Sequence, residues 1–337
     1  MKPSVLVTGG AGYIGSHACK ALDAAGYTPV AYDSLVFGHR WAVQWGPLVV
    51  GDLADTALIR KTIRDHNIGA CIHFAAFTYV GESVTDPRKY FRNNVVNTLG
   101  LMDSLVEAGV KRMVFSSTCA TYGDPEYMPL DETHRQHPVN PYGESKLMVE
   151  RMLHWYGRAY GLGWTALRYF NASGADPEGR IGEEHDPETH LIPLVLQTAL
   201  GERSHIGIFG TDYPTADGTA VRDYIHVDDL ADAHVLALRH LERGGESQAF
   251  NLGTGTGHSV RAVIEAAERV TGQTVPVQLA PRREGDPAVL VAEPKRAREV
   301  LGWQPKHTDL DGIVATAWNW HQLMAEFRRL PFGKAVA

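Results

Sequence analysis

Short apolar runs alternate with stretches of helical length through the first half of the chain. Glycine or polar turn residues bound each run, and helical patterns such as Ile14–Ala24 and Asp86–Ala108 stand between them. This alternation is typical of a parallel β-sheet with helices on both faces. The predicted strands are Ser4–Thr8, Thr28–Tyr32, Leu48–Val50, Ala70–Phe74, Arg112–Ser116 and Trp164–Arg168.

The pattern changes after about residue 170. Asn171–Thr189 is rich in Gly, Pro, Asp and Glu and has no clear periodicity, which predicts an irregular connection. Fewer strands and more loops follow, as expected of a smaller domain that closes over a ligand. The predicted elements are helices at Ile192–Leu200, Val227–Leu241, Ser259–Thr271 and Leu310–Phe327, and a short strand at Gly207–Phe209.

The length of 337 residues suits two compact units. We expect an α/β fold, with a Rossmann-type doubly wound parallel sheet over residues 1–170. A smaller α/β substrate-binding domain is expected over residues 171–337, with parts that return to pack on the first. Ligands of such sheets bind beyond the carboxyl ends of the strands, so the residues just after each strand deserve most scrutiny.

Composition and charge exclude several classes of protein. The formal net charge is −7, and no run of Lys or Arg could follow a phosphate backbone, so no nucleic-acid partner is expected. No uncharged apolar stretch approaches the ~18 residues of a membrane helix, and the first residues do not resemble a signal peptide. The scattered Cys19, Cys71 and Cys119 predict buried thiols in a cytoplasmic protein, without disulfides or zinc.

A glycine loop follows the first predicted strand. Gly9, Gly12 and Gly15 form a GxxGxxG spacing that leads into a helix. Glycine there permits a tight turn, close approach to a diphosphate and close packing of helix on strand, while the helix N-terminus faces the anion. Asp33, which ends the second strand, could accept hydrogen bonds from ribose hydroxyls and would repel a 2′-phosphate. The loop therefore predicts a dinucleotide site that favours NAD.

His39 and Arg40 lie close behind the acid of the second strand and keep NADP open. Two further strand ends share the predicted ligand edge, where an acid could reach the adenine and small residues would let the backbone pass beside the diphosphate. Ordinary loop chemistry explains either stretch about as well. The residues concerned are Asp52, Leu53, Phe74, Ala75 and Ala76.

Tyr142 and Lys146 lie one turn apart on a predicted helix that Asn140 caps and Gly161 ends. Such a pair is common on solvated helices. An enzyme that takes a hydride from a carbinol must also remove the hydroxyl proton, and the pKa of a phenol, ~10, must then fall by about three units. An ammonium and a nicotinamide cation at about 5 Å would each contribute ~3 kcal/mol at an effective dielectric constant of ~20. Tyr142 is therefore predicted to be a catalytic base.

The fifth predicted strand ends in hydroxyl residues. Ser117 or Thr118 could bond the reacting oxygen and relay its proton, because both lie at the carboxyl edge near the start of the Tyr142 helix. Capping of the backbone is an equally ordinary role for either hydroxyl.

These motifs together resemble the extended short-chain dehydrogenase/reductase superfamily, and the remaining ones are similar to its UDP-glucose 4-epimerase (UDP-galactose 4-epimerase) branch. They cover nearly the whole chain in family order, and their succession is highly specific. The matching stretches are Thr8–Gly15, Gly51–Asp52, His73–Ala76, Val80–Ser83, Phe115–Gly123, Pro141–Lys146, Arg168–Asn171, Val221–Val227 and Pro281–Asp286.

The resemblance implies reversible inversion at C4 of a UDP-hexose through a 4-keto intermediate, with transient hydride transfer to bound NAD. It implies Tyr142 as base, Lys146 as its helper and Thr118 as hydroxyl partner, where Ser is the family's alternative. A homodimer joined through Asp86–Ala108 and Tyr142–Tyr160 would suit the superfamily. Further implied cofactor residues are Tyr13, Ile14, Asn94 and Tyr169, and implied UDP-sugar residues are Thr118, Asn171, Leu191, Phe209, Arg222, Arg283 and Asp286.

Some alternatives stay open. Thr78 stands where some epimerases carry a cofactor-contacting Lys, which leaves the retention of NAD open, and Leu290 leaves N-acetylated substrates open. A UDP-xylose/UDP-arabinose 4-epimerase is the nearest rival. A nucleotide-sugar dehydratase would normally carry Asp-Glu after Thr118, whereas Cys119 and Ala120 follow here, and an NAD-binding regulator would not need the Tyr142 pair.

Two other features receive ordinary interpretations. The Gly-Thr-Gly-Thr-Gly stretch at 253–257 is predicted to be a turn before a helix. The 16 histidines, including His134, His137, His185 and His190, show no ligand spacing with nearby acids or thiols, so no metal site is predicted.

Overall fold

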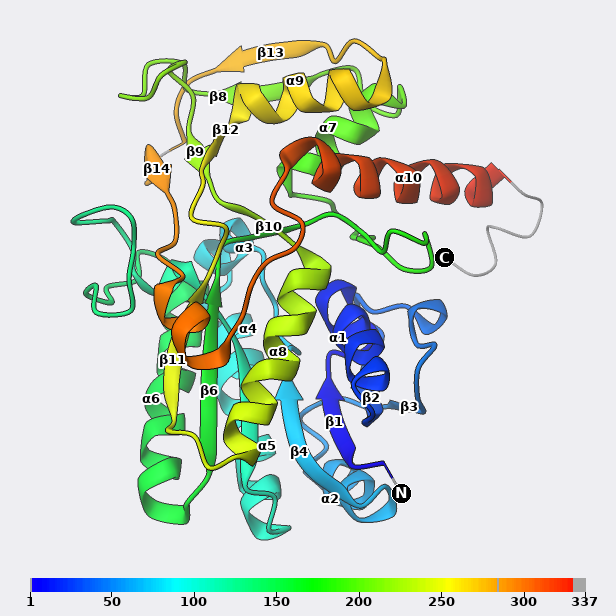
Figure 1. The fold of residues 1–337 in the computed structure, drawn as a ribbon, viewed down its shortest axis with the longest axis vertical. Helices are drawn as coiled ribbons and strands as arrows, with labels where there is room; N and C mark the ends of the chain where they lie inside the picture. Colours follow the sequence, from blue (N-terminus) through cyan, green and yellow to red (C-terminus); the bar gives the residue numbers. More distant parts are fainter. Residues whose placement is uncertain (1, 284, 330–337) are drawn as a thin grey trace.

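A seven-stranded parallel sheet with helices on both faces forms the larger part of the molecule (Figure 1). The structure is a computed structural model and describes residues 2–283 and 285–329. The strand order β11-β6-β5-β4-β1-β2-β3 confirms the predicted α/β class with a doubly wound sheet. The strands are β1 (Ser4–Thr8), β2 (Thr28–Asp33), β3 (Leu48–Val50), β4 (Ile68–His73), β5 (Arg112–Thr118), β6 (Gly163–Tyr169) and β11 (Gln248–Leu252).

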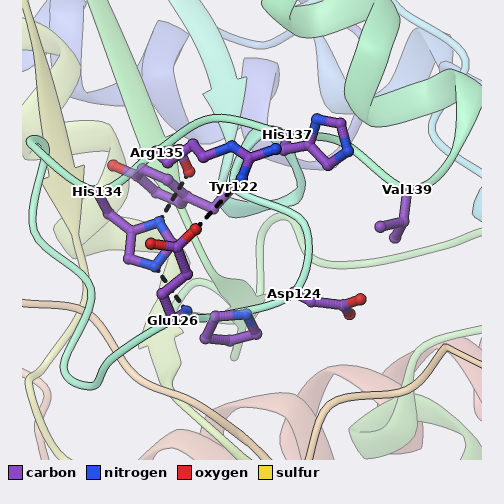
Figure 2. A pocket seen from close by; sticks show the side chains of 8 residues that line it. Tyr122, Asp124, Glu126, His134, Arg135, His137 and Val139 are labelled. Atoms are coloured by element: carbon purple, nitrogen blue, oxygen red, sulfur yellow. Dashed lines mark hydrogen bonds and ion pairs between the residues drawn. The ribbon is translucent and has the colours of Figure 1, made fainter.

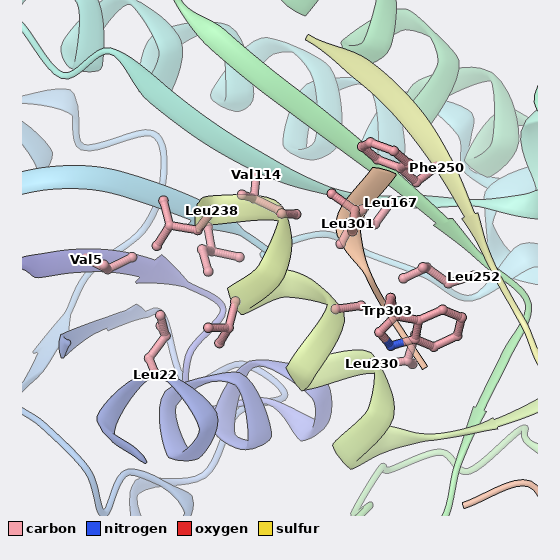
Figure 3. Packing of buried hydrophobic residues seen from close by; sticks show 14 of the residues in the cluster. Val5, Leu22, Val114, Leu167, Leu230, Leu238, Phe250, Leu252, Leu301 and Trp303 are labelled. Carbon is pink, nitrogen blue, oxygen red and sulfur yellow. The ribbon is translucent and has the colours of Figure 1, made fainter. Parts of the chain in front are cut away.

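Two apolar clusters cover the two faces of this sheet. On one face, α1 (Tyr13–Ala24) and α8 (Val227–Glu242) pack against each other and against the sheet, with Trp303 filling the space beside α8 (Figure 3). On the other face, α2 (Thr56–Asp65), α5 (Asn97–Glu107) and α6 (Pro141–Tyr160) close the second cluster. Because both faces are buried, the strands form continuous apolar runs that could be recognised in the sequence.

The strand β11 was not predicted. It comes from the second half of the chain and pairs in parallel with β6, with Phe250 opposite Leu167. Its five residues include the polar Gln248 and Asn251, so no apolar run marks it. Its place depends on pairing with a distant segment, which local sequence patterns do not record.

The helix predicted over Asp86–Ala108 is interrupted. Asp86 caps a first turn, α4 (Pro87–Tyr90), by accepting a hydrogen bond from the Lys89 N–H at 3.2 Å. Residues Phe91–Val96 then wind as a π-helix before α5 begins. Wide turns of this kind are frequent at functional sites. A short α3 (Val80–Thr85) precedes them.

The second half of the chain builds a smaller unit above the carboxyl edge of the large sheet (Figure 1). Its core lies between α7 (Leu191–Ala199), α9 (Val260–Thr271) and α10 (Leu310–Arg329). One of its small strands, Asn171–Ser173, falls in the segment predicted to be irregular, because a parallel pair with a distant strand extends it. The small strand pairs are β7 (Asn171–Ser173) with β10 (Tyr224–His226), β8 (Ile206–Phe209) with β13 (Val277–Ala280), and β9 (Val221–Arg222) with β12 (His258–Ser259) and β14 (Val289–Leu290).

The expected second domain ended at residue 337, and its residues 330–337 lie outside the described residues, as does Glu284 of the Pro281–Asp286 stretch. Cys19 and Cys71 are buried, and all three cysteines are free thiols. No helix in the described part of the chain combines the length and the apolar character needed to span a bilayer.

Candidate active site

The glycine loop between β1 and α1 has the shape predicted for a diphosphate cradle. Gly9 has φ +74°, a left-handed conformation that favours glycine. A Cβ on Gly15 would lie 2.0 Å from the Gly9 carbonyl oxygen, whereas one on Gly12 would meet nothing closer than 3.4 Å. Gly12 begins α1 without a side-chain cap, and the first turn holds no acid, so its N–H groups suit an anion. These residues fit the diphosphate of a dinucleotide.

We expect Gly15→Ala to lower NAD affinity at least tenfold, because the new methyl group forces α1 away from the loop. Isothermal titration of NAD would measure the loss. Gly69→Ala in β4 is the matched control, since its Cβ would lie 3.9 Å from the nearest atom. Equal affinity in both variants would contradict this role of the loop.

Asp33 is held against the glycine loop at the end of β2. Its carboxylate accepts hydrogen bonds from the backbone N–H groups of Ala11, at 2.9 Å, and Leu35, at 2.8 Å. Burial raises its pKa, although both bonds act in the opposite direction. Of the two neighbours that kept NADP open, His39 stacks on Trp41 at 5.1 Å. The acid is therefore fixed where the sequence placed the ribose-binding group.

The other predicted cofactor residues line the same edge of the sheet. The backbone N–H groups of Phe74 and Ala75 donate to the Thr8 carbonyl oxygen, and Ala75 lies against Gly9. Ala76 continues this loop, Leu53 is buried, and Asp52 is exposed and turns the chain after β3. The Tyr13 hydroxyl donates to the Gly174 carbonyl oxygen at 2.6 Å, which ties α1 to the second half of the chain, and Ile14 beside it is half-buried.

Asn94 lies in the π-helical segment and is buried. Its side-chain amide bonds both the N–H and the C=O of Phe77, each at 2.9 Å, and donates to the Ser145 hydroxyl at 3.1 Å. The amide therefore joins the loop after β4 to the helix of Tyr142. Thr78, the next residue of that loop, is exposed.

Tyr142 and Lys146 project from the first turns of α6 as predicted. Asn140 caps this helix by accepting from the Gly143 N–H at 2.8 Å, and Gly161 ends it in a left-handed conformation. The Lys146 ammonium is buried, donates to the Ser116 carbonyl oxygen at 2.7 Å and lies 6.0 Å from the Tyr142 ring centroid. The pair thus faces the end of β5.

The structure separates the two hydroxyls at the end of β5. The Ser117 hydroxyl donates to Glu150 at 2.6 Å on the far side of the strand. Thr118 points the other way; it lies close enough to Tyr142 to lower the pKa of the phenol, and its hydroxyl accepts from the Ala120 N–H at 3.2 Å. Tyr169, at the end of β6, bonds the Ser116 hydroxyl and raises the pKa of Tyr142. Thr118 is therefore the hydroxyl that meets Tyr142, because alternate residues of a strand face opposite ways.

Burial sets the protonation of the pair. It raises the pKa of Tyr142, and it lowers the pKa of Lys146 to about 7, against an opposing effect of Glu150. This differs from the expectation that the Lys146 ammonium already favours a phenolate, because loss of water disfavours the charged form of both groups. The protein part of the site therefore does not ionise Tyr142 by itself.

The lowered pKa of Lys146 has a consequence for stability. Between pH ~7 and ~10.5 the unfolded chain holds a proton on Lys146 that the folded chain has lost, so stability rises with pH by up to ~1.4 kcal/mol per unit. Lys146→Met lacks this dependence. The unfolding free energy of the wild type should therefore rise by about 2–3 kcal/mol relative to that of the variant between about pH 7.5 and about pH 9.5. Urea unfolding at both pH values would measure the difference, and a constant gap would contradict the lowered pKa.

Apart from Thr118, the residues implied for UDP belong to the smaller unit. The Arg222 guanidinium is largely buried and donates to the Asp286 carboxylate at 2.5 Å. It also lies close enough to Cys119, directly after Thr118, to lower the pKa of that thiol, which burial raises to about 11. The Arg283 guanidinium is 3.9 Å from the Phe209 ring centroid. Asn171 begins β7, Leu191 begins α7, and both are half-buried.

A pocket of about 280 Å³ lies away from these residues, in the loop after β5. Figure 2 shows His134 and His137 on its wall, with His134 Nε2 accepting from the Glu126 N–H at 2.9 Å. The second ring nitrogen of His134 bonds the Arg135 carbonyl oxygen at 2.8 Å. Both ring nitrogens of His134 are therefore bonded to backbone groups. None of the predicted site residues lines the pocket.

The 253–257 stretch is a turn, as predicted. The buried Asp223 carboxylate accepts from the N–H groups of Thr254, at 2.8 Å, and Gly255, at 3.1 Å. An internal acid thus occupies the position that a phosphate would need.

The sequence interpretation of the histidines needs a correction. The fold gathers His185 and His190 with Glu183 and Glu188, whose ligand atoms all lie within 4.8 Å of one another. Four ligating residues within eight positions were the available signal. They were missed because their spacing matches neither a helical face nor a strand.

The buried ion pair of Glu150 and Arg168 was also missed. The Arg168 Nη2 lies 2.6 Å from Glu150, and both side chains are only 7% exposed. Glu150 lies one turn after Lys146 on α6 and accepts from Ser117, so the pair supports the strand end that carries Thr118. An acid at this spacing on a buried helical face was the signal in the sequence.

Comparison with known proteins gives concordant similarities. Residues 5–253 match the NAD dependent epimerase/dehydratase family. The chain is 54% identical to the UDP-glucose 4-epimerase of Rhizobium meliloti (strain 1021), over 94% of this chain and 97% of that protein. The UDP-glucose 4-epimerase of Brucella ovis, solved in complex with NAD, superposes with a TM-score of 0.92 and 52% identity, covering 94% and 97% of the two chains. That of Stenotrophomonas maltophila, with bound NAD and formylated UDP-arabinopyranose, gives 0.93 and 40%, covering 97% and 99%.

Proposed function

The chain belongs to the NAD dependent epimerase/dehydratase family, and we propose that it catalyses the reversible epimerisation of UDP-glucose and UDP-galactose at C4. The observation that carries this proposal is the position of Lys146, bonded to the Ser116 carbonyl oxygen at the end of β5 and 6.0 Å from the Tyr142 ring centroid, at the edge of the sheet that bears the glycine loop. Relatives above 50% identity over nearly the whole chain are named UDP-glucose 4-epimerases, and a similar structure contains NAD.

Tyr142 accepts the proton of the 4-hydroxyl in the proposed mechanism. When bound, NAD supplies the hydride acceptor at C4 and a positive ring charge beside the phenol. The Ser116 carbonyl oxygen holds the Lys146 ammonium near the phenol, and we assign the Thr118 hydroxyl at the end of β5 to bond the reacting oxygen. The product of this half-reaction is a 4-keto sugar on UDP. In the return step Tyr142 would give the proton back to the C4 oxygen, and bound cofactor would supply the hydride to the opposite face of C4.

UDP must stay anchored while the sugar turns. Arg222 and Arg283 are the guanidinium groups that we assign to the diphosphate, because such groups bind phosphate with directed, charge-assisted hydrogen bonds. The Arg222 guanidinium donates to the Asp286 carboxylate through one nitrogen, and this bond fixes its orientation. The apolar Leu290, opposite Arg222 in the β9–β14 pair, offers the sugar no hydrogen bond.

Incubation with UDP-galactose and no added NAD tests the proposal. We expect NMR of the products to show UDP-glucose, with NAD released from the denatured protein. Turnover only with added NAD would show that the cofactor is exchanged, as the exposed Thr78 leaves open. No inversion with or without NAD would overturn the proposed function.

UDP-pentose epimerisation is the second candidate. A structure 40% identical to this chain holds formylated UDP-arabinopyranose, so a similar protein accommodates a pentose nucleotide. Rates on UDP-arabinose and UDP-galactose, measured side by side, distinguish the two substrates. A larger kcat/KM on the pentose would reassign the substrate and leave the chemistry of Tyr142 unchanged.

We propose a homodimer formed through the helices beside the π-helical segment. Val96, Leu99 and Trp155 on these helices are 60%, 39% and 63% exposed. We expect a Leu99→Glu/Trp155→Glu variant to sediment as a monomer, because a desolvated charge disfavours association. The control is Leu279→Glu on β13, which is 60% exposed in the smaller unit. A dimer that survives the double substitution would exclude this surface.

We also retain two proposals from the sequence. The boundary between a cofactor unit and a UDP-sugar unit is placed near residue 170. A cytoplasmic location agrees with three free thiols, which persist in a reducing compartment.

A further inference from the structure

Four side chains of one loop bring one possible ligand atom each to within 4.8 Å of the others, beside the start of α1. His190 Nδ1 lies 2.8 Å from a Glu183 oxygen and 2.9 Å from a Glu188 oxygen. His185 Nδ1 lies 3.2 Å and 3.5 Å from oxygens of the same two carboxylates. Ligands with bonds of ~2.0–2.1 Å in a tetrahedral zinc site are about 3.3 Å apart, within the range of these four contacts.

The alignment of these groups differs from that of an ion pair. Only the contact between His190 and Glu188 has hydrogen-bond geometry. The fully buried Nδ1 of His185 has no aligned partner although two carboxylates lie within 3.5 Å, so it points between them. An imidazolium N–H aims at one oxygen, whereas a neutral imidazole that shares a metal ion with two carboxylates points between them.

The charges of the cluster also suit a dication. Glu183 and Glu188 are 5% and 6% exposed, and no Lys or Arg within residues 2–283 and 285–329 forms an ion pair with either. Two buried carboxylates need two compensating positive charges. Two imidazolium rings would supply them, and so would one divalent ion with two neutral imidazoles; the misaligned Nδ1 of His185 favours the ion.

We propose that Glu183, His185, Glu188 and His190 form a binding site for one divalent metal ion of the zinc type. Two imidazole nitrogens and two carboxylate oxygens suit zinc better than magnesium, which prefers six oxygen ligands. The site requires that the most distant ligand atoms, now within 4.8 Å of one another, close by up to about 1.5 Å.

The site occupies a junction between the two units. The His185 ring lies 6.3 Å from that of Tyr13 at the start of α1, and His190 immediately precedes α7. The Glu183 carbonyl oxygen accepts from the Trp320 indole N–H on α10 at 2.9 Å. A bound ion would therefore fix this loop between α1, α7 and α10, in a structural role.

Metal analysis of the full chain without a polyhistidine tag tests the proposal. The protein is treated with EDTA, dialysed against Zn²⁺ and assayed for metal, with Mg²⁺ in parallel. We expect about one Zn²⁺ and no Mg²⁺ per chain, and Co²⁺ should give the visible absorption of a tetrahedral site. A His185→Gln/His190→Gln variant should bind Zn²⁺ at least tenfold more weakly.

The matched control is His205→Gln, an exposed histidine at the start of β8 that should leave the stoichiometry unchanged. Circular dichroism checks folding. If the double variant unfolds, His190→Gln alone carries the test, because this side chain is 47% exposed. Equal zinc binding by the wild type and the folded variant, or no zinc in the wild type, would overturn the proposal.

Discussion

Replacing Tyr142 by Phe should lower kcat at least a hundredfold while NAD and UDP still bind. The substitution removes only the hydroxyl that we assign as the general base, and a positioned base typically accelerates a reaction 10²–10⁴-fold. The ring remains to fill the space beside Thr118, so the fold and the binding residues keep their places. Initial rates at saturating UDP-galactose measure the loss, and calorimetry measures the retained affinities.

A tyrosine at the opposite edge of the sheet provides the matched control. Tyr27 lies just before β2 and donates to Glu242 at 2.6 Å, so Tyr27→Phe also removes a bonded hydroxyl. This variant should keep the wild-type kcat. A Tyr142→Phe enzyme with near-wild-type turnover would end the assignment of the base, whatever its substrate.

Arg168→Met should lower the free energy of unfolding by about 3–5 kcal/mol, the usual cost of leaving a buried charge without its partner. Arg168 bonds Glu150 through two nitrogens, at 2.6 and 3.0 Å, and also donates to the Tyr122 hydroxyl at 3.0 Å. Its loss strands the Glu150 carboxylate in the interior. Urea unfolding of the purified protein measures the change.

The matched control is Arg269→Met. Arg269 pairs with Asp311 at 2.6 Å, but the two side chains are 57% and 41% exposed. An exposed pair contributes less than about 1 kcal/mol, so this variant should unfold close to the wild type. Similar losses in the two variants would show that burial does not determine the strength of the Arg168 pair.

The parts of the molecule predicted well are those specified by neighbouring residues. The strand β1, the glycine turn and the start of α1 lie within twenty residues, and a Cβ on Gly15 would collide with the nearby Gly9 carbonyl oxygen. The helix of Tyr142 carries its own Asn140 cap and Gly161 stop, so its bounds could be recognised before the fold was known.

The parts predicted poorly depend on contacts between distant segments. Ser117 and Thr118 are both hydroxyls at a strand end, and only the position of Glu150 on α6 decides which one turns away from Tyr142. The π-helical segment replaces a regular helix where Asn94 bonds the loop after β4. No local pattern records either contact.

The pairing of β11 with β6 also affects how the protein is made. A nascent chain that ends before Gln248 already contains the six remaining strands of the large sheet, but β6 is left as an open edge. Unpaired edges invite association with other chains. We therefore expect the cofactor unit to fold stably only after residue 252 has left the ribosome. Expression of residues 1–170 alone should yield aggregates.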